Sequence, residues 1–214
     1  MSKPWSAITA AVAAVAGLAG AAYYLILMRP LTRTNGTIRL EGLNVEVEIL
    51  RVRWGVPHIY AAGEHDLLFA QGFTHAQDRL WQMDLWRRLV AGRLSEVMGE
   101  LTVPVDRWIR TLSMRRVAEQ EARQLTAEPR SLLEAYAAGV NARIAHGRLP
   151  VEFTILRYKP EPWTPADTLA WIKYMSWGLS VNWESELLRA QLIQLLGPEL
   201  AAELEADQLG GKHT

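Results

Sequence analysis

The folding pattern of this 214-residue chain is clearest in Arg51-Val52-Arg53-Trp54-Gly55-Val56-Pro57-His58-Ile59-Tyr60. Just before it, residues 45–49 read Val-Glu-Val-Glu-Ile, and this period of two predicts a strand with one buried face. Gly55 permits an unusual backbone angle and Pro57 restricts the residue before it, which predicts a hairpin turn. Residues 58–61 are then the returning strand, and residues 37–40 also alternate as a candidate short strand.

A long helix is predicted after the hairpin. It includes Gly72-Phe73-Thr74-His75-Ala76-Gln77-Asp78-Arg79-Leu80-Trp81-Gln82-Met83 and runs from about Leu67 to Val90, with apolar residues at three- and four-residue spacings. Asp66 is the expected N-cap, its carboxylate accepting free backbone N–H groups. Gly72 predicts a break or a close packing contact. We interpret His75 as structural, because no carboxylate or nucleophile motif accompanies it.

Two more helices are predicted in the middle of the chain. Residues 106–126 have the pattern of an amphipathic helix with an exposed basic face. Thr126 is the expected cap of the second helix, which continues to Gly147. The proline-containing stretch at residues 149–165 predicts an extended connection.

The C-terminal part also predicts two helices. Thr164-Pro165-Ala166-Asp167 combines a hydroxyl cap, a proline at the first helical position and an acidic first turn. Residues 169–177 are mostly apolar, so this helix is expected to be buried on several sides until Gly178 breaks it. Residues 183–196 predict the last helix, which Gly197-Pro198 stops.

Composition excludes several classes of protein. Lys+Arg and Asp+Glu are equal at 23 each, so the chain has no net positive charge that would attract a nucleic-acid partner. The chain has no cysteine, which excludes disulfides, thiolate metal sites and a cysteine nucleophile. Nine tryptophans are many for this length and are typical of core or interface side chains, or of an aromatic pocket.

The N-terminal region predicts export. Residues 5–28 carry no charge and are numerous enough to span a bilayer as a helix. Ala19-Gly20-Ala21 offers the small residues that a signal peptidase needs, but the apolar character continues beyond them. We therefore interpret residues 1–29 as a signal peptide or membrane anchor, with the uncleaved anchor preferred, and residues 30–44 as a linker.

No catalytic constellation can be assembled from the sequence. It contains no Gly-x-Ser-x-Gly elbow, no Ser-x-x-Lys pair, no zinc-protease helix and no phosphate-binding glycine-rich loop. No catalytic residue is therefore assigned.

Several motifs that follow one another in a fixed order explain why this chain has no catalytic residues of its own. Gly-Val-Pro-His-Ile, His-Ala-Gln-Asp-Arg-Leu-x-Gln-Met, Arg87-Arg88 and Gly-Arg-Leu-x-Glu resemble the α-subunit of the penicillin acylase (penicillin amidase) family of N-terminal-nucleophile amidohydrolases. The resemblance continues through residues 149–153 and 158–163 and ends near residues 182–186. Val52 departs from the pattern, because the family usually has Asp at that place.

The resemblance implies an α+β fold that is mainly helical in this chain. The hairpin would contribute to an αββα core, and residues 45–214 would form the α-subunit domain. It also implies a precursor that is cut into α- and β-chains. The nucleophile would be a Ser at the new N-terminus of the β-chain, so this chain alone is expected to be inactive on its substrate, a small N-acyl amide.

The resemblance assigns roles to several side chains. It implies that Tyr174, Trp177 and Gly178 line part of an acyl-binding pocket, although an ordinary core role stays open for them. It also favours a partly buried ion-pair network on the long helix that holds the helix against the larger subunit. Five residues have the required spacing: Asp78, Arg79, Asp84, Arg87 and Arg88.

The resemblance implies a shared calcium ion as well. Glu184 best matches the α-chain glutamate that binds calcium in many family members, and Glu186 is the competing position. One carboxylate cannot hold calcium without further oxygen ligands from the β-chain. A glutamate in the first turn of a helix is also a common dipole or capping residue.

Two alternatives stay open at this point. Within the family, an acyl-homoserine lactone acylase or a cephalosporin acylase would share these motifs. Outside it, the alternative is a truncated fragment or a non-catalytic, membrane-anchored helical module. In that module, the basic face of residues 106–126 would bind a partner or a lipid headgroup.

Overall fold

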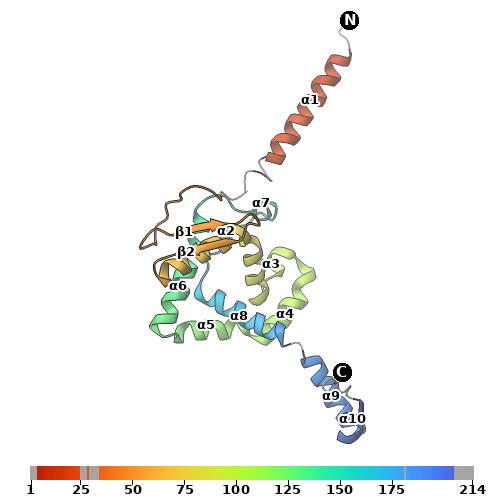
Figure 1. The fold of residues 1–214 in the computed structure, drawn as a ribbon. Coiled ribbons are helices and arrows are strands. Elements are labelled where there is room, and N and C mark those ends of the chain that lie inside the picture. Colours follow the sequence, from red (N-terminus) through yellow and green to blue (C-terminus); the bar gives the residue numbers. More distant parts are fainter. Residues whose placement is uncertain (1–3, 25–27, 29–33, 181, 205–214) are drawn as a thin grey trace, which may run out of the picture. The chain divides into compact units, whose positions relative to one another are not determined.

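The computed structural model describes residues 4–24, 28, 34–180 and 182–204 (Figure 1). Within these residues the chain is mainly helical and has one small antiparallel sheet, which confirms the predicted class. Contacts divide the chain into two compact units, Met1–Ile172 and Lys173–Thr214.

The helices and strands follow one another along the chain. In order they are α1 (Pro4–Tyr23), β1 (Glu48–Arg51), β2 (Pro57–Tyr60), α2 (Glu64–Val90), α3 (Ser95–Met98), a 3-10 turn (Glu100–Thr102), α4 (Val103–Leu112), α5 (Met114–Gln124), α6 (Ala127–Ala145), α7 (Val151–Ile155), α8 (Pro165–Leu179), α9 (Trp183–Leu196) and α10 (Pro198–Leu204).

The predicted hairpin is confirmed, with a first strand that begins only at Glu48 and a returning strand shifted by one residue. β1 pairs antiparallel with β2, with Glu48 opposite Tyr60 and Arg51 opposite Pro57. Residues 37–40 form no strand, so that expectation was wrong. Gly36 and Gly42 bend the backbone on either side of them, with φ of 93° and 102°.

Helices α2 and α6 cross closely enough to require glycine on both sides. A Cβ on Gly72 of α2 would lie 2.1 Å from the carbonyl oxygen of Tyr136. A Cβ on Gly139 of α6 would lie 1.9 Å from the carbonyl oxygen of Phe69. Gly72 is therefore the predicted packing contact, and the break in α2 lies instead at Arg79, with φ −140° and ψ 24°.

The start of α2 differs from the prediction. Gly63 is the N-cap, and Asp66 lies inside the first turn. The Asp66 carboxylate accepts backbone N–H groups of Asn44 and Val45, at 2.9 and 3.1 Å. The hydrogen bond from Asn44 is the main reason that the pKa of Asp66 is lowered. Asp66 thus fixes the segment before β1 instead of capping its own helix.

The core lies between α2, α6 and the connection from α6 to α8. Its buried members are Ala76, Leu80, Ala137, Val140, Phe153 and Trp163. Phe153 belongs to α7, a helix inside the stretch predicted to be extended. The Phe153 ring meets the Trp81 ring edge-on, with centroids 5.5 Å apart. This aromatic packing anchors α7 through Phe153 and explains why the proline-containing connection is not fully extended.

Two other helix predictions need correction. Ser113, with φ 60°, divides the expected helix over residues 106–126 into α4 and α5. Gly178 does not break α8, which continues to Leu179. The last predicted helix is confirmed as α9, and α10 follows it unpredicted.

No helix in the described part of the chain has both the length and the apolar character that a bilayer crossing requires. The anchor expected at residues 5–28 also includes residues 25–27, which lie outside the described residues.

Candidate functional site

The start of α8 is fixed by one buried carboxylate. Asp167 is 4% exposed, and its Oδ2 accepts the backbone N–H and the hydroxyl of Thr164, each at 2.7 Å. Arg115 of α5 donates to Oδ1 at 2.5 Å. The predicted helix start is therefore confirmed, and Asp167 also joins two helices. Arg115 escaped prediction because it lies 52 residues away and belongs to no motif.

The middle of α8 contacts α2 through an aromatic pair. The ring centroids of Trp171 and Trp86 are 5.1 Å apart, with the ring planes tilted by 53°. Such pairs add roughly 1 kcal/mol to the free energy gained from burying the rings. Together with Asp167, this pair fixes the half of α8 that precedes the predicted pocket residues.

The end of α8 brings together two of the three predicted pocket residues. The rings of Tyr174 and Trp177 have centroids 5.9 Å apart, and both side chains are half-buried. Gly178 follows on the exposed surface, and a Cβ added to it would have no atom within 4 Å. The arrangement is an aromatic pair beside open space.

One face of α8 is apolar but exposed, which corrects the expectation of burial on several sides. Ile172, Met175 and Leu179 are 52%, 40% and 78% exposed. Their spacing of three and four residues places them on one stripe of the helix. Only Ala166, Asp167 and Ala170 of α8 are buried. The apolar composition predicted burial correctly only for the face that this chain covers itself.

The candidate calcium ligand lies at the start of α9. Glu184 and Glu186 are both exposed in its first turn. Side chains two residues apart do not face each other on a helix, so these two carboxylates cannot form one chelate. Among the described residues, no three acidic, histidine or cysteine side chains are grouped as a metal site.

The charges of α2 form a network that is largely buried. Asp84 is 1% exposed and accepts hydrogen bonds from Arg87, from Arg88 at 2.9 Å and from the Tyr158 hydroxyl at 2.7 Å. Burial, followed by the bond to Asp84, raises the pKa of Tyr158. Arg87 also donates to the carbonyl oxygens of Glu161 and Pro162, at 2.9 and 3.2 Å.

A second set of charges extends the network to the surface. Arg93 donates to Glu96 and Glu161, each at 2.7 Å in its shortest bond. Glu96 also accepts from Arg88 at 2.6 Å. The expected network is therefore present, but it joins α2 to other segments of the same chain. Asp78 pairs instead with Arg51 of β1, at 2.9 Å.

His75 has the surroundings of a structural residue. Its Nδ1 lies 3.0 Å from the Tyr136 hydroxyl, and the two rings pack edge-on with centroids 5.8 Å apart. Burial lowers the pKa of His75, which favours the neutral ring.

Comparison with known protein families gives a match over residues 46–210, to the family described as Penicillin amidase. The chain belongs to the penicillin amidase family. The match covers the hairpin, α2 with its charge network, α8 and α9.

Individual relatives from this family are similar over most of the chain. Penicillin acylase 2 proenzyme of Pseudomonas sp. (strain SE83) is 38% identical over 86% of this chain. Acyl-homoserine lactone acylase QuiP of Pseudomonas aeruginosa is 36% identical over 94% of it. The solved structure of a thermostable penicillin G acylase from Alcaligenes faecalis has 31% identity and a TM-score of 0.61. That similarity covers 74% of this chain and 88% of the solved one.

These relatives are much longer than the present chain. The chain spans 24% of the length of both the Pseudomonas penicillin acylase 2 proenzyme and the P. aeruginosa lactone acylase. It therefore corresponds to about a quarter of a penicillin amidase family protein of that kind.

Proposed function

We propose that this chain is the α-subunit portion of an exported amidohydrolase that cleaves the acyl amide of β-lactam antibiotics or related N-acyl compounds. The observation that carries the proposal is family membership over residues 46–210, together with 38% identity to a penicillin acylase proenzyme. Export is supported by the charge-free stretch at residues 5–28.

The reacting groups would come from a β-chain of the same precursor. A Ser at the β-chain N-terminus would attack the amide carbonyl, and its own α-amine would take the hydroxyl proton. A terminal amine suits this role because its unperturbed pKa of about 7.7–8.0 lies close to neutrality. The α-ammonium would give that proton to the leaving nitrogen as the C–N bond of the tetrahedral adduct breaks, which leaves an acyl-enzyme that water then hydrolyses. Oxyanion donors would also come from the β-chain.

This chain would supply part of the wall of the acyl-binding pocket and a contact surface for the β-chain. The Tyr174–Trp177 pair and the exposed stripe of Ile172, Met175 and Leu179 offer apolar surface for an acyl group and for the β-chain. Pockets that select an acyl chain or a ring are mostly apolar with few polar groups. Gly178 would leave room for the substrate beside the aromatic pair, because a Cβ there meets nothing within 4 Å.

Glu184 is the proposed calcium ligand. Its exposed carboxylate, at the first turn of α9, is accessible to an ion shared with another chain. Calcium needs six to eight oxygen ligands, so the β-chain would have to provide most of them. The ion would be structural and would hold α9 to the partner. Glu186 remains the competing ligand, because it is equally exposed in the same turn.

A second substrate class is favoured by one observation. The P. aeruginosa acyl-homoserine lactone acylase matches 94% of this chain, at 36% identity. Cleavage of an acyl-homoserine lactone breaks the same kind of acyl amide bond. The acyl wall proposed on α8 suits an aliphatic chain as well as a ring.

The non-catalytic module has less support. It depended on a continuous basic helix over residues 106–126, which Ser113 interrupts. Arg115, in the same stretch, is engaged by Glu119 and Asp167 at 2.7 and 2.5 Å. These arginine contacts serve the fold and leave less charge for a lipid headgroup.

The test is a chimeric precursor in which this chain replaces the matched quarter of the Pseudomonas penicillin acylase 2 proenzyme. We call the remaining polypeptide of that proenzyme the companion. The chimera is expected to cleave phenylacetyl or longer acyl amides, while the chain and the companion expressed separately do not. Stable association of the two chains without any gain in acyl-amide cleavage would contradict the proposal. Failure of the two chains to associate would contradict the subunit assignment itself.

A further inference from the structure

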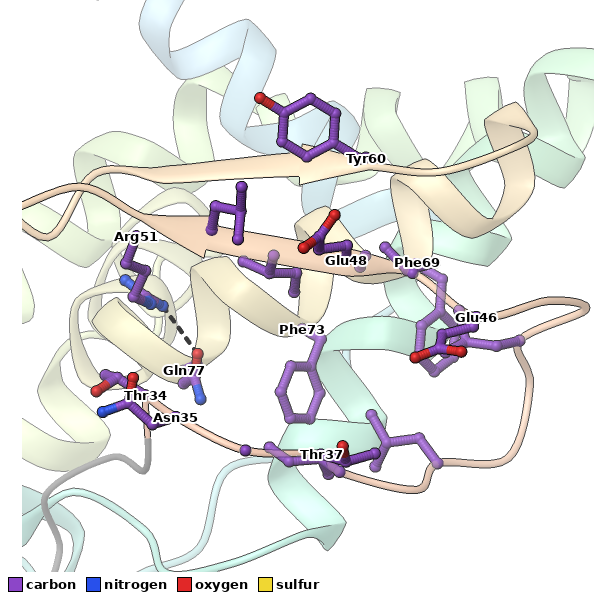
Figure 2. A pocket seen from close by; sticks show the side chains of 18 residues that line it. Thr34, Asn35, Thr37, Glu46, Glu48, Arg51, Tyr60, Phe69, Phe73 and Gln77 are labelled. Carbon is purple, nitrogen blue, oxygen red and sulfur yellow. Dashed lines mark hydrogen bonds between the residues drawn. The ribbon is translucent and has the colours of Figure 1, made fainter.

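Only one asparagine of this chain is followed by glycine, in the sequence Thr34-Asn35-Gly36-Thr37. Asn35 and Gly36 are both exposed and belong to neither a helix nor a strand. Figure 2 shows Asn35 on the segment that faces β1 across a cavity of about 690 Å³. Water therefore has access to both residues.

Gly36 leaves the backbone nitrogen that follows Asn35 open to attack the Asn35 side chain. Its φ is 93°, a conformation that glycine adopts readily and other residues rarely do. Glycine has no Cβ, so no side chain of Gly36 shields this nitrogen. Among the described residues, no backbone carbonyl accepts the Gly36 N–H. The nitrogen is thus able to approach the side-chain amide carbon of Asn35 without losing a backbone hydrogen bond.

Asn44 is the nearest asparagine in the sequence, and its surroundings are the opposite. Its side-chain amide donates to Asp66 at 3.2 Å. The N–H of the following residue, Val45, donates to the same carboxylate at 3.1 Å. Both the amide and the nitrogen that would attack it are therefore held in place, and Val45 also has a branched side chain.

The other two asparagines are hindered in different ways. Asn141 lies inside α6, and both ends of its amide are bonded to the backbone of Trp163, at 2.9 and 2.7 Å. Asn182 is exposed, but the bulky Trp183 follows it. Asn182 is therefore an internal control for exposure without a following glycine.

We propose that Asn35 is a site of spontaneous deamidation, with water as the only co-reactant. The Gly36 nitrogen loses its proton to a base in solution and attacks the side-chain amide carbon of Asn35. The side-chain nitrogen takes up a proton from solvent and leaves as ammonia, which closes a cyclic succinimide. Water then adds to either carbonyl carbon and breaks its bond to the ring nitrogen. One opening gives aspartate, and the other gives isoaspartate, in which the main chain runs through the side-chain carbon.

Either product adds a carboxylate to the wall of the cavity. The charged residues that line the cavity are Glu46, Glu48 and Arg51. Arg51 already donates two hydrogen bonds to Asp78, each at 2.9 Å. The modification would therefore make this surface more acidic, and isoaspartate would also lengthen the main chain of the wall by a methylene group. This inference does not depend on the proposed function.

Peptide mass spectrometry of the full chain tests the site, because cleavage after Lys and Arg places each asparagine in a separate peptide. Asn35 lies in the peptide of residues 34–39. During incubation at neutral pH, this peptide should acquire the mass change of an amide-to-acid exchange at least about ten-fold faster than the other three, because only Asn35 precedes glycine. The rate should rise with pH, since the attacking nitrogen must lose its proton. Equal rates for all four peptides, or a rate independent of pH, would overturn the proposal.

A synthetic peptide of residues 34–39 gives the rate without a fold. The folded chain is expected to react within about ten-fold of this rate, because the segment is exposed and has no regular structure to open. A slower reaction in the folded chain would show that the structure protects Asn35, and would overturn the proposal.

Asn35→Gln is the matched control, because its longer side chain closes the ring poorly. The mass change in residues 34–39 should be absent from this variant, and its persistence would assign the change to another residue. Methylation by an isoaspartyl-specific methyltransferase identifies the product of the wild-type chain. Isoaspartate is expected, and a product that contains aspartate alone would contradict the cyclic intermediate and overturn the proposal.

Discussion

Arg115 and Asp167 are joined by a hydrogen bond of 2.5 Å that ties α5 to the first turn of α8. Asp167 is buried, while Arg115 keeps a second acidic partner, Glu119, at 2.7 Å. The same arginine thus contacts one buried and one exposed carboxylate. Comparing these two contacts distinguishes the role of Asp167, which holds the start of α8 in place, from that of Glu119, which forms an ordinary surface ion pair.

Asp167→Ala is expected to lower the free energy of unfolding by about 2–3 kcal/mol, because it leaves Thr164 and Arg115 without their buried acceptor. Glu119→Gln removes the exposed partner of the same arginine and should cost about 1 kcal/mol or less. Urea unfolding of both variants measures the difference. Equal losses would show that Asp167 is an ordinary ion-pair residue and does not fix α8.

Gly139→Ala should destabilise the crossing of α2 and α6 by about 3 kcal/mol. Its Cβ would lie 1.9 Å from a backbone oxygen, which no side-chain rearrangement can relieve. Gly178→Ala is the matched control in an α-helix, because its Cβ meets nothing within 4 Å. That substitution should leave stability unchanged or raise it by less than about 1 kcal/mol. Thermal unfolding that ranks the two variants in the opposite order would contradict the crossing described here.

Glu161 gives a pH dependence with a defined sign. Hydrogen bonds from Arg93 are the main reason that its pKa falls from 4.5 to about 2. A lowered pKa contributes stability that is fully present above pH 4.5 and is lost as the pH falls through about 2. Because the side chain is 51% exposed, solvent screening limits the effect to about 1 kcal/mol or less.

Glu161→Gln should remove this contribution, so the variant should lose less stability than the wild type between pH 4.5 and pH 2. Denaturant unfolding at several pH values provides the measurement. Parallel stability curves for the two proteins would mean that the Arg93–Glu161 pair contributes nothing.

Trp177→Ala should alter the acyl preference of the assembled enzyme. Truncating one ring of the Tyr174–Trp177 pair enlarges the apolar wall, which we expect to change the ratio of kcat/KM for a phenylacetyl and an octanoyl amide by about ten-fold. Trp54→Ala, at a side chain 76% exposed on the hairpin, is the control for loss of a tryptophan. An unchanged kcat/KM ratio in the Trp177 variant would show that Trp177 does not line the acyl-binding pocket.

Calcium removal tests the role proposed for Glu184. Chelation of calcium should lower the unfolding temperature of the assembled pair, because a ligand that binds only the folded state stabilises it. Glu184→Gln should abolish this response, while Glu186→Gln should retain it. The reverse result would show that Glu186 is the calcium ligand. If chelation does not change the unfolding temperature of the wild type, the proposed calcium site is wrong.

The sequence predicted the parts of the fold that follow from local patterns. The hairpin, the long helix and the start of α8 were predicted because alternation, periodicity and the Thr164-Pro165-Ala166-Asp167 motif act over a few residues. The break at Ser113 was missed, since a left-handed residue without glycine leaves no clear signal. The burial of α8 was overestimated, because composition does not tell whether the covering surface belongs to the same chain.

The candidate site, like the fold, was only partly predictable from the sequence. The family motifs indicated Tyr174 and Trp177, and the structure places their rings together. The role of Arg115 was not predictable, because it depends on a contact between residues far apart in the sequence, with a separation of 52 positions between Arg115 and Asp167.

The most direct measurement of the central claim is the intact mass of each chain after a serine-sulfonylating reagent is added to the assembled chimera. We predict one reagent adduct, on the N-terminal serine of the companion, none on this chain, and parallel loss of acyl-amide cleavage. An adduct on this chain that accounts for the lost activity, or cleavage by this chain alone, would contradict the claim that the reactive serine belongs to a second polypeptide.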